Sequence, residues 1–121
     1  MSKTSQTDGF ERVTIEEGDM GEPIDGVRLT LLAGGEQMNA QRFEIMPGVE
    51  VPLHSHPAEQ VGQLFEGTLT FLTDDEEVVC EAGDSYSIPA GENHGARNDG
   101  DEPAIGVEMF SPPRRNPDWR D

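Results

Sequence analysis

The stretch Gly48-Val-Glu-Val-Pro-Leu-His54-Ser-His56-Pro-Ala-Glu-Gln60 contains two of the three histidines of the protein, one residue apart. Alternate residues of a β-strand point to the same face, so His54 and His56 can direct two imidazoles at one point. The third histidine lies in a second segment rich in turn residues, Pro89-Ala-Gly91-Glu-Asn-His94. Neutral imidazole is the commonest protein ligand of first-row metals. Because two solvated strand histidines give the same pattern, a metal site depends on the residues around the pair.

Short apolar blocks separated by Gly, Pro, Asp and Asn run through the whole chain. Of its 121 residues, 33% are hydrophobic, 14 are Gly and 9 are Pro, and no amphipathic helical period is evident. The runs Gln37–Met46, Thr68–Thr73 and Ala104–Phe110 are typical of strands. Residues 18–26, with three Gly and one Pro, are expected to form a loop. Roughly eight or nine short strands without crossover helices predict an all-β sandwich or closed barrel.

The length of the chain suits a single domain with one hydrophobic core. Residues 1–9 are polar, and we expect them to form a flexible N-terminus. Residues 10–111 are expected to form the barrel. Residues 112–121 are rich in Pro and Arg, and we expect this tail to pack on the barrel. Trp119 is expected to anchor it on the barrel or on a second subunit.

The protein is strongly acidic, with 25 Asp and Glu residues against 8 Lys and Arg, a formal net charge of −17. Nucleic-acid binding is not expected, because phosphate contacts need clustered Lys and Arg. A charge of this size repels itself and destabilises the folded state at low ionic strength. We therefore hypothesise a host with a high-salt cytoplasm. Thermal melts should then show stability that rises with KCl, and flat or falling stability would contradict the hypothesis.

The only cysteine lies in the apolar run Val78-Val79-Cys80, where a small packed side chain is expected rather than a reactive thiol. A single cysteine forms no internal disulfide and no Cys-based metal cluster. No apolar segment reaches about ten residues, so neither a transmembrane span nor a signal-peptide core is expected. We expect a soluble, cytoplasmic protein that does not bind membranes.

Both histidine segments resemble the motifs of the cupin superfamily. The first motif, G-x5-H-x-H-x3/4-E-x6-G, falls at these spacings on Gly48, His54, His56, Gln60 and Gly67, with Gln60 in the place of the usual Glu. The second motif, G-x5-P-x-G-x2-H-x3-N, is matched at every fixed position by Gly83, Pro89, Gly91, His94 and Asn98. The resemblance implies a double-stranded β-helix, the cupin jelly-roll barrel.

The resemblance also implies a cofactor, one divalent transition metal at the mouth of the barrel. Its implied ligands are His54, His56, Gln60 and His94. Mn, Fe, Ni, Co and Zn all suit such a set, and ligand type alone does not choose among them. An amide in place of a carboxylate leaves the full charge on the ion, which is then a stronger Lewis acid but is bound less tightly. Glu59 is the alternative fourth ligand if the strand is shifted by one residue, although its parity points it away from the histidine pair.

The end of the chain adds a narrower resemblance. The patterns His-Ser-His-Pro-x-Glu-Gln and acid-x-Phe-Ser-Pro-x-Arg resemble the small cupins of pectin and alginate breakdown, which linearise 4,5-unsaturated uronates. In that group an Asp, a Phe and an Arg at this spacing serve the reaction. The matching positions are Glu108, Phe110 and Arg114, so Glu stands where that group has Asp.

These three residue types suit the reaction chemically. Glu108 can move a proton as a catalytic acid or base. Arg114 can clamp a substrate carboxylate with paired hydrogen bonds, as a second catalytic residue. Phe110 is expected to contact the substrate. Each also has a plain structural explanation: a solvated edge-strand carboxylate, a surface ion pair and a core ring, respectively. Further candidates for the cavity are Gln41, Arg42, Gln63, Tyr86 and Arg97.

The expected function is that of a metal-dependent enzyme acting on a small sugar acid or other carboxylate metabolite, by uronate ring opening or isomerisation. One alternative is an Fe(II)-dependent dioxygenase, since some cupins activate O₂ on three histidines. Another is a non-catalytic cupin that binds a metal or ligand. The tail favours the first, because a carboxylate clamp beside a redox-neutral metal suits tautomer chemistry. The expected partners are a small-molecule ligand and a second copy of the chain, as a homodimer.

Overall fold

The computed structural model describes residues 4–7 and 9–114, which form twelve strands and no helix. The strands are β1 (Thr4–Thr7), β2 (Phe10–Arg12), β3 (Asp19–Ile24), β4 (Val27–Gly34), β5 (Asn39–Ile45), β6 (Glu50–His54), β7 (Glu59–Glu66), β8 (Thr68–Leu72), β9 (Glu77–Glu81), β10 (Ser85–Ile88), β11 (His94–Arg97) and β12 (Ala104–Ser111). The all-β prediction is therefore confirmed for this part of the chain. It contains no helix long and apolar enough to cross a membrane.

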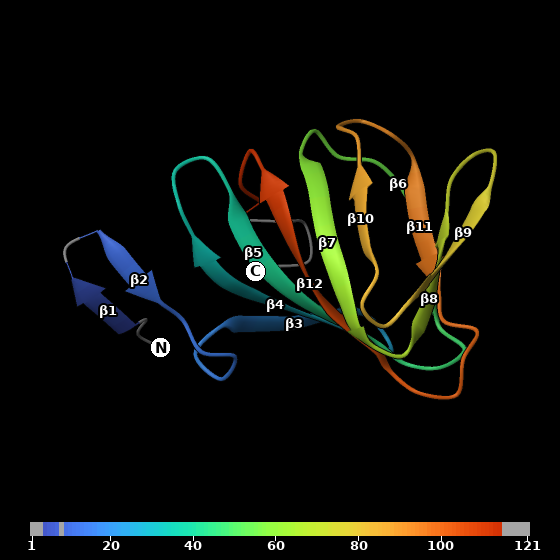
Figure 1. Ribbon diagram of the computed structural model, residues 1–121, viewed down its shortest axis with the longest axis horizontal. Helices are drawn as coiled ribbons and strands as arrows, with labels where there is room; N and C mark the ends of the chain where they lie inside the picture. The colour runs from blue at the N-terminus through green and yellow to red at the C-terminus, as the bar shows by residue number, and fades with distance from the viewer. Residues whose placement is uncertain (1–3, 8, 115–121) are drawn as a thin grey trace.

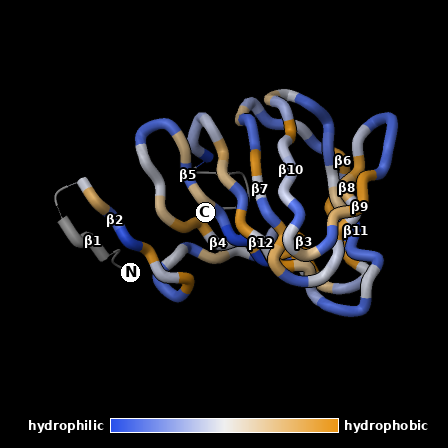
Figure 2. The backbone as a smooth tube through the Cα atoms, viewed as in Figure 1, coloured by the Kyte–Doolittle hydropathy of each residue, from blue (hydrophilic) through white to orange (hydrophobic). Residues whose placement is uncertain are grey.

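Two larger antiparallel sheets make up the body of the protein (Figure 1). The first has six strands in the order β10-β7-β12-β5-β4-β3, and the second has four in the order β6-β11-β8-β9. Strands that are distant in the sequence are neighbours, as in β7–β12 and β12–β5. The acidic turn that joins β8 to β9, residues 73–76, is hydrophilic (Figure 2). Asp74, Asp75 and Glu76 are exposed there, so water solvates their like charges.

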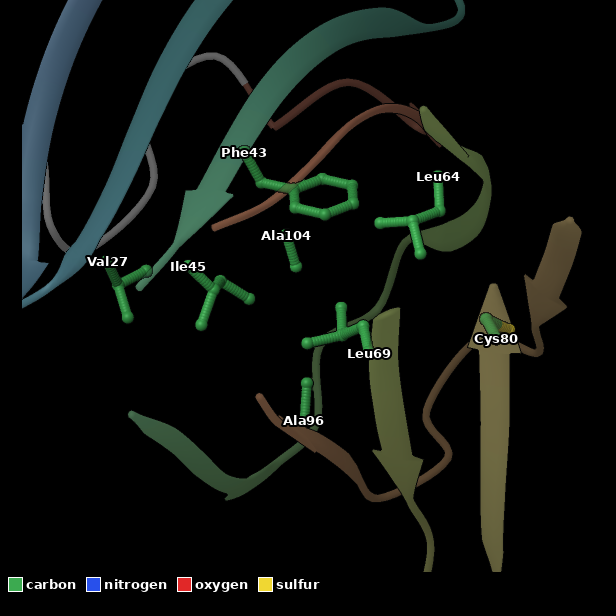
Figure 3. Packing of buried hydrophobic residues seen from close by; sticks show 8 residues of the cluster. All are labelled: Val27, Phe43, Ile45, Leu64, Leu69, Cys80, Ala96 and Ala104. Carbon is green, nitrogen blue, oxygen red and sulfur yellow. The ribbon is translucent and has the colours of Figure 1, made fainter. Parts of the chain in front are cut away.

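The core lies between the two sheets. Along β5, β7 and β12, buried residues alternate with more exposed ones, because successive side chains of a strand point to opposite faces. The buried apolar cluster, drawn in Figure 3, consists of Val27, Phe43, Ile45, Leu64, Leu69, Cys80, Ala96 and Ala104. Cys80 is thus a packed core residue, as predicted. The same inner face also carries buried polar side chains, namely Asn39, Gln41, Gln60 and Glu108.

The prediction of a loop over residues 18–26 is wrong. Most of this segment forms β3, which pairs with β4 at the edge of the six-stranded sheet. The prediction fails because Gly21 and Pro23 are typical of loops. An edge strand, however, has one side without a ladder partner, so the missing N–H of Pro23 costs it little.

The structure tests what the sequence predicts for the N-terminal end of the chain but not for the C-terminal tail. The sequence predicts no strand before Phe10, whereas in the structure β1 pairs with β2 as a separate two-stranded sheet, drawn apart from the body in Figure 1. At the other end, residues 115–121 lie outside the described residues. The expected packing of the tail through Trp119 therefore stays a prediction.

Candidate metal centre and ligand cavity

Two segments far apart in the sequence bring the histidines together. β6 ends at His54 and β11 begins at His94, and these residues face each other in the antiparallel ladder. His56 follows β6, where its carbonyl accepts a hydrogen bond from the N–H of Gly91 at 2.9 Å. The ring centroids lie 4.4 Å (His54–His94), 4.9 Å (His56–His94) and 5.8 Å (His54–His56) apart. Their ligand nitrogens all lie within 4.8 Å of one another, so one ion can reach all three.

A backbone carbonyl orients each of the three rings. The Nδ1 of His54 donates to the carbonyl of Pro52 at 3.0 Å, and the Nδ1 of His56 donates to that of Ala58 at 2.9 Å. His94 repeats the arrangement with Glu92 at 2.9 Å. A carbonyl only accepts, so the proton of each neutral ring is on Nδ1 and the lone pair is on Nε2. Such outer hydrogen bonds fix the tautomer and orientation of metal-binding histidines.

Gln60 completes a donor set that suits a divalent metal. Its Nε2 donates to Glu108 Oε1 at 2.6 Å, which turns its Oε1 toward His56 Nε2, 3.1 Å away. Since the proton of His56 is on Nδ1, these two atoms are both acceptors and face each other with no proton between them. A cation removes this repulsion, so the residues fit the implied metal. Glu59, in contrast, is exposed on the opposite face of β7.

Burial holds His56 and His94 in the neutral form that binds metals. Burial lowers the pKa of His94 to about 4, against the smaller opposing effect of its hydrogen bond to Glu92. Burial also lowers the pKa of His56, and the nearby positive charge of Arg114 acts in the same direction. Both rings are therefore neutral at neutral pH, as metal coordination requires.

A row of inner-face residues crosses the six-stranded sheet next to the histidines. The strand register places Tyr86 opposite Gly62, Gly62 opposite Glu108, and Glu108 opposite Gln41. Glu108 Oε1 accepts hydrogen bonds from Tyr86 Oη at 2.7 Å and from Gln60, and its Oε2 accepts one from Gln41 Nε2 at 3.1 Å. Burial raises the pKa of Glu108, while these three donors oppose the shift.

Gly62 makes this row possible. A Cβ added there would lie 2.4 Å from the Tyr86 hydroxyl oxygen and 3.0 Å from Glu108 Cβ. Only a residue without a side chain leaves room for Tyr86 to reach across β7 to Glu108. Burial raises the pKa of Tyr86, and the adjacent Glu108 raises it further, so the hydroxyl remains a donor.

A cavity of about 230 Å³ lies between the two sheets, with the histidine cluster in its wall. Much of the wall is aliphatic or aromatic and includes Val27, Leu29, Phe43, Ile45, Leu69 and Phe71. Among the described residues that line it, Glu108 is the one carboxylate and Arg114 the one guanidinium. The Phe110 ring lies between two charged or polar groups, 5.6 Å from the His56 ring and 5.3 Å from Arg114 Cζ.

All seven residues singled out for the site line this cavity: His54, His56, Gln60, His94, Glu108, Phe110 and Arg114. Glu108 is buried on the central strand β12, so the solvated edge-strand explanation does not hold. Phe110 is only 1% exposed and therefore packs in the interior as well as lining the cavity.

Of the further candidates, Gln41 and Tyr86 also line the cavity. The other three candidates do not line it. Arg42 forms an ion pair with Glu44, and Gln63 donates a hydrogen bond to the carbonyl of Gly83. Arg97 forms ion pairs with Asp99 and Glu77. Sequence reasoning missed two residues. Gly62 had a signal, because a glycine inside a strand marks a close approach. Asn39, whose Oδ1 accepts a hydrogen bond from the backbone N–H of Arg114 at 2.6 Å, had none.

Comparison with known sequences agrees with the motifs. The sequence family described as Cupin domain matches residues 41–110. A germin-like protein of Arabidopsis thaliana (subfamily 2 member 1) is 28% identical over 85% of this chain and 51% of its own length. The tetracenomycin polyketide synthase protein TcmJ of Streptomyces glaucescens is 34% identical over 58% of this chain and 48% of its own length. The chain thus spans about half the length of the curated relatives that it matches.

Solved structures confirm the jelly-roll fold. An RmlC-like cupin from Shewanella frigidimarina superposes with a TM-score of 0.77 at 24% identity, covering 96% of this chain and 98% of its own. KdgF from Halomonas sp. superposes with a TM-score of 0.73 at 23% identity, covering 84% of this chain and 94% of its own. At these identities, the likeness establishes the shared fold.

Proposed function

The chain belongs to the cupin family, and on that basis we propose that it is a metal-dependent enzyme that opens or isomerises a small sugar acid or a related carboxylate metabolite. The observation that carries the proposal is that Glu108 and Arg114 both line the cavity whose wall also contains the three histidines. A buried carboxylate can move a proton, and a guanidinium can hold the carboxylate of a ligand.

Linearisation of a 4,5-unsaturated uronate is the sharpest form of the proposal. Ring opening breaks the bond between C1 and the ring oxygen: the C1 hydroxyl loses its proton to become an aldehyde, and the ring oxygen gains one to become an enol. The enol then loses that proton while C4 gains one, which gives the ketone. No atom is added or lost, so the reaction needs a group that accepts and returns protons and needs no oxidant.

Glu108 is positioned to be that proton-transfer group. The Tyr86 hydroxyl and the amides of Gln41 and Gln60 hold its two oxygens in place. Fixed orientation of this kind is a large part of catalytic efficiency. A divalent metal, when bound by the three histidines and Gln60, supplies a Lewis acid that stabilises negative charge on an oxygen.

Turnover without O₂ tests the proposal. Metal-loaded protein is mixed with 4,5-unsaturated galacturonate under nitrogen and in air, and loss of the ultraviolet absorbance of the conjugated double bond is followed. We expect equal rates under both atmospheres. Consumption in air alone would identify an oxygenase. If fully metal-loaded protein does not turn over the uronate, the remaining explanation is a non-catalytic cupin that binds a metal or ligand.

Arg114→Ala is the variant that tests the carboxylate clamp. Hydrogen bonds to charged groups contribute about 1.5–3 kcal/mol, so the affinity for the uronate should fall roughly 10- to 150-fold. The metal content should stay unchanged, because Arg114 is not one of the implied metal ligands. Arg97→Ala removes a partly exposed guanidinium outside the cavity and is the matched control. If Arg114→Ala binds the uronate as tightly as the wild type does, the proposed role of Arg114 as a carboxylate clamp is refuted.

The apolar wall supports a second candidate, a cupin whose ligand has an aromatic face. Phe43, Leu69 and Phe71 offer such a ligand a hydrophobic surface. The similarity to TcmJ, named for a polyketide synthase, is in keeping with this candidate. Tighter binding of an aromatic acid such as 1-naphthoate than of galacturonate, with no uronate turnover, would favour it.

A further inference from the structure

The amide of Gln41 is an incompletely satisfied polar group in the cavity wall. The residue is 2% exposed, and its Oε1 is buried without a hydrogen-bond donor anywhere in the described chain. Buried acceptors are almost always paired, because leaving one unpaired is destabilising. An exception that lines a ligand cavity points to a hydrogen-bond donor that the described residues do not supply.

The orientation of this amide is fixed by its neighbour. Gln41 Nε2 donates to Glu108 Oε2 at 3.1 Å, while Glu108 Oε1 already accepts from Tyr86 and Gln60. Rotating the amide by half a turn would place Oε1 against a carboxylate oxygen, two acceptors in contact. The Nε2 therefore stays on Glu108, and the Oε1 remains the free acceptor.

We propose that Gln41 is a specificity-determining residue that accepts a hydrogen bond from a hydroxyl group of the ligand, and that the ligand is therefore a hydroxy acid. The proposal rests on the proposed function, in which Arg114 holds the carboxylate of the same ligand. It goes further by stating what the ligand carries at its other end.

The distance along the strand between the two residues guides the choice of test ligands. Arg114 is tied through its backbone to Asn39, and Gln41 lies two residues farther along β5 on the same face. Both Arg114 and Gln41 line the cavity. Two residues of a strand span ~7 Å, and an extended chain of five or six bonds covers about the same distance. Hydroxy acids with five or six carbon atoms are therefore the first ligands to test.

Paired acids that differ by one hydroxyl group test the contact. Titrations of metal-loaded protein compare pentanoate with 5-hydroxypentanoate and hexanoate with 6-hydroxyhexanoate. In an apolar cavity without an acceptor, the added hydroxyl weakens binding because its desolvation is not compensated. With Gln41 as acceptor, we expect the wild type to bind one of the hydroxy acids about tenfold more tightly than its parent acid.

Gln41→Met keeps the length of the side chain but removes the acceptor, so the preference for the hydroxy acid should disappear or reverse. The unfolding midpoint should not fall greatly, because the substitution also removes an unpaired buried oxygen. Gln63→Met, on the outward face of β7, is the matched control and should keep the preference.

The outcomes separate this inference from the proposed function. Binding of the acids with no preference for either hydroxy acid in the wild type would overturn the Gln41 contact alone and indicate that a water satisfies the amide. That comparison uses the wild type alone, so it tests the contact even if Gln41→Met folds poorly. Failure of all four acids to bind would remove the carboxylate clamp, and this inference with it.

Discussion

His94→Ala should release the metal from a barrel that still folds. His94 supplies one of three nitrogens that lie within 4.8 Å of one another, and alanine leaves the ion with an incomplete set of ligands. Changes to outer-shell partners alone reduce metal affinity by about 10- to 100-fold, so loss of a direct ligand should exceed 100-fold. Elemental analysis after dialysis should find about one ion per chain in the wild type and almost none in the variant.

The fold should survive this loss, because the histidines are not part of the apolar cluster that fills the space between the sheets. Circular dichroism and a cooperative melt check this on the same samples. Tyr86→Phe alters the cavity without removing an implied ligand and should keep the ion. If His94→Ala retained wild-type metal content, the three-histidine site would be refuted.

Glu108→Gln should have the largest effect on turnover. Glutamine has nearly the same shape as glutamate but does not transfer protons at neutral pH. General acid–base groups contribute about 10²- to 10⁴-fold to a rate, so kcat on the unsaturated uronate should fall by that factor. Metal content should change little, since Glu108 contacts Gln60 through the amide nitrogen and not through the oxygen that faces His56.

Two further variants distinguish proton transfer from simple disruption. Tyr86→Phe removes one of the three donors that hold Glu108 and should lower kcat less than Glu108→Gln does. Glu59→Gln makes the same chemical change on the exposed face of β7, and its rate should equal that of the wild type. A kcat for Glu108→Gln within a few-fold of the wild-type value would show that another group transfers the proton.

The sequence predicts the parts of the site that depend on local spacing. The alternation in β5, β7 and β12 indicates their buried faces, and the two motifs indicate that His94 meets His54 and His56. The physical reason is that β6, in the first motif, pairs with β11, in the second motif, so that His54 lies opposite His94. The sequence also predicts that Glu108 and Phe110 lie on one face, because they are two residues apart on one strand. Both are on the inner face of β12.

Features that depend on cross-strand register are less visible in the sequence. The unpaired oxygen of Gln41 follows from the neighbours of that residue on β12, and the role of Asn39 follows from where the chain passes after β12. The strand β3 is hidden by its glycine and proline, which an edge position tolerates. The homodimer, the cytoplasmic location and the salt-rich host stay predictions.

Anomalous diffraction from crystals of the protein loaded with Mn, Fe, Ni, Co or Zn tests the metal centre most directly. We expect one strong peak, within about 2.4 Å of Nε2 of His54, His56 and His94 and of Oε1 of Gln60. A peak elsewhere, such as the acidic turn at residues 73–76, or no peak in protein that binds metal in solution, would contradict the convergence of the histidines on one ion.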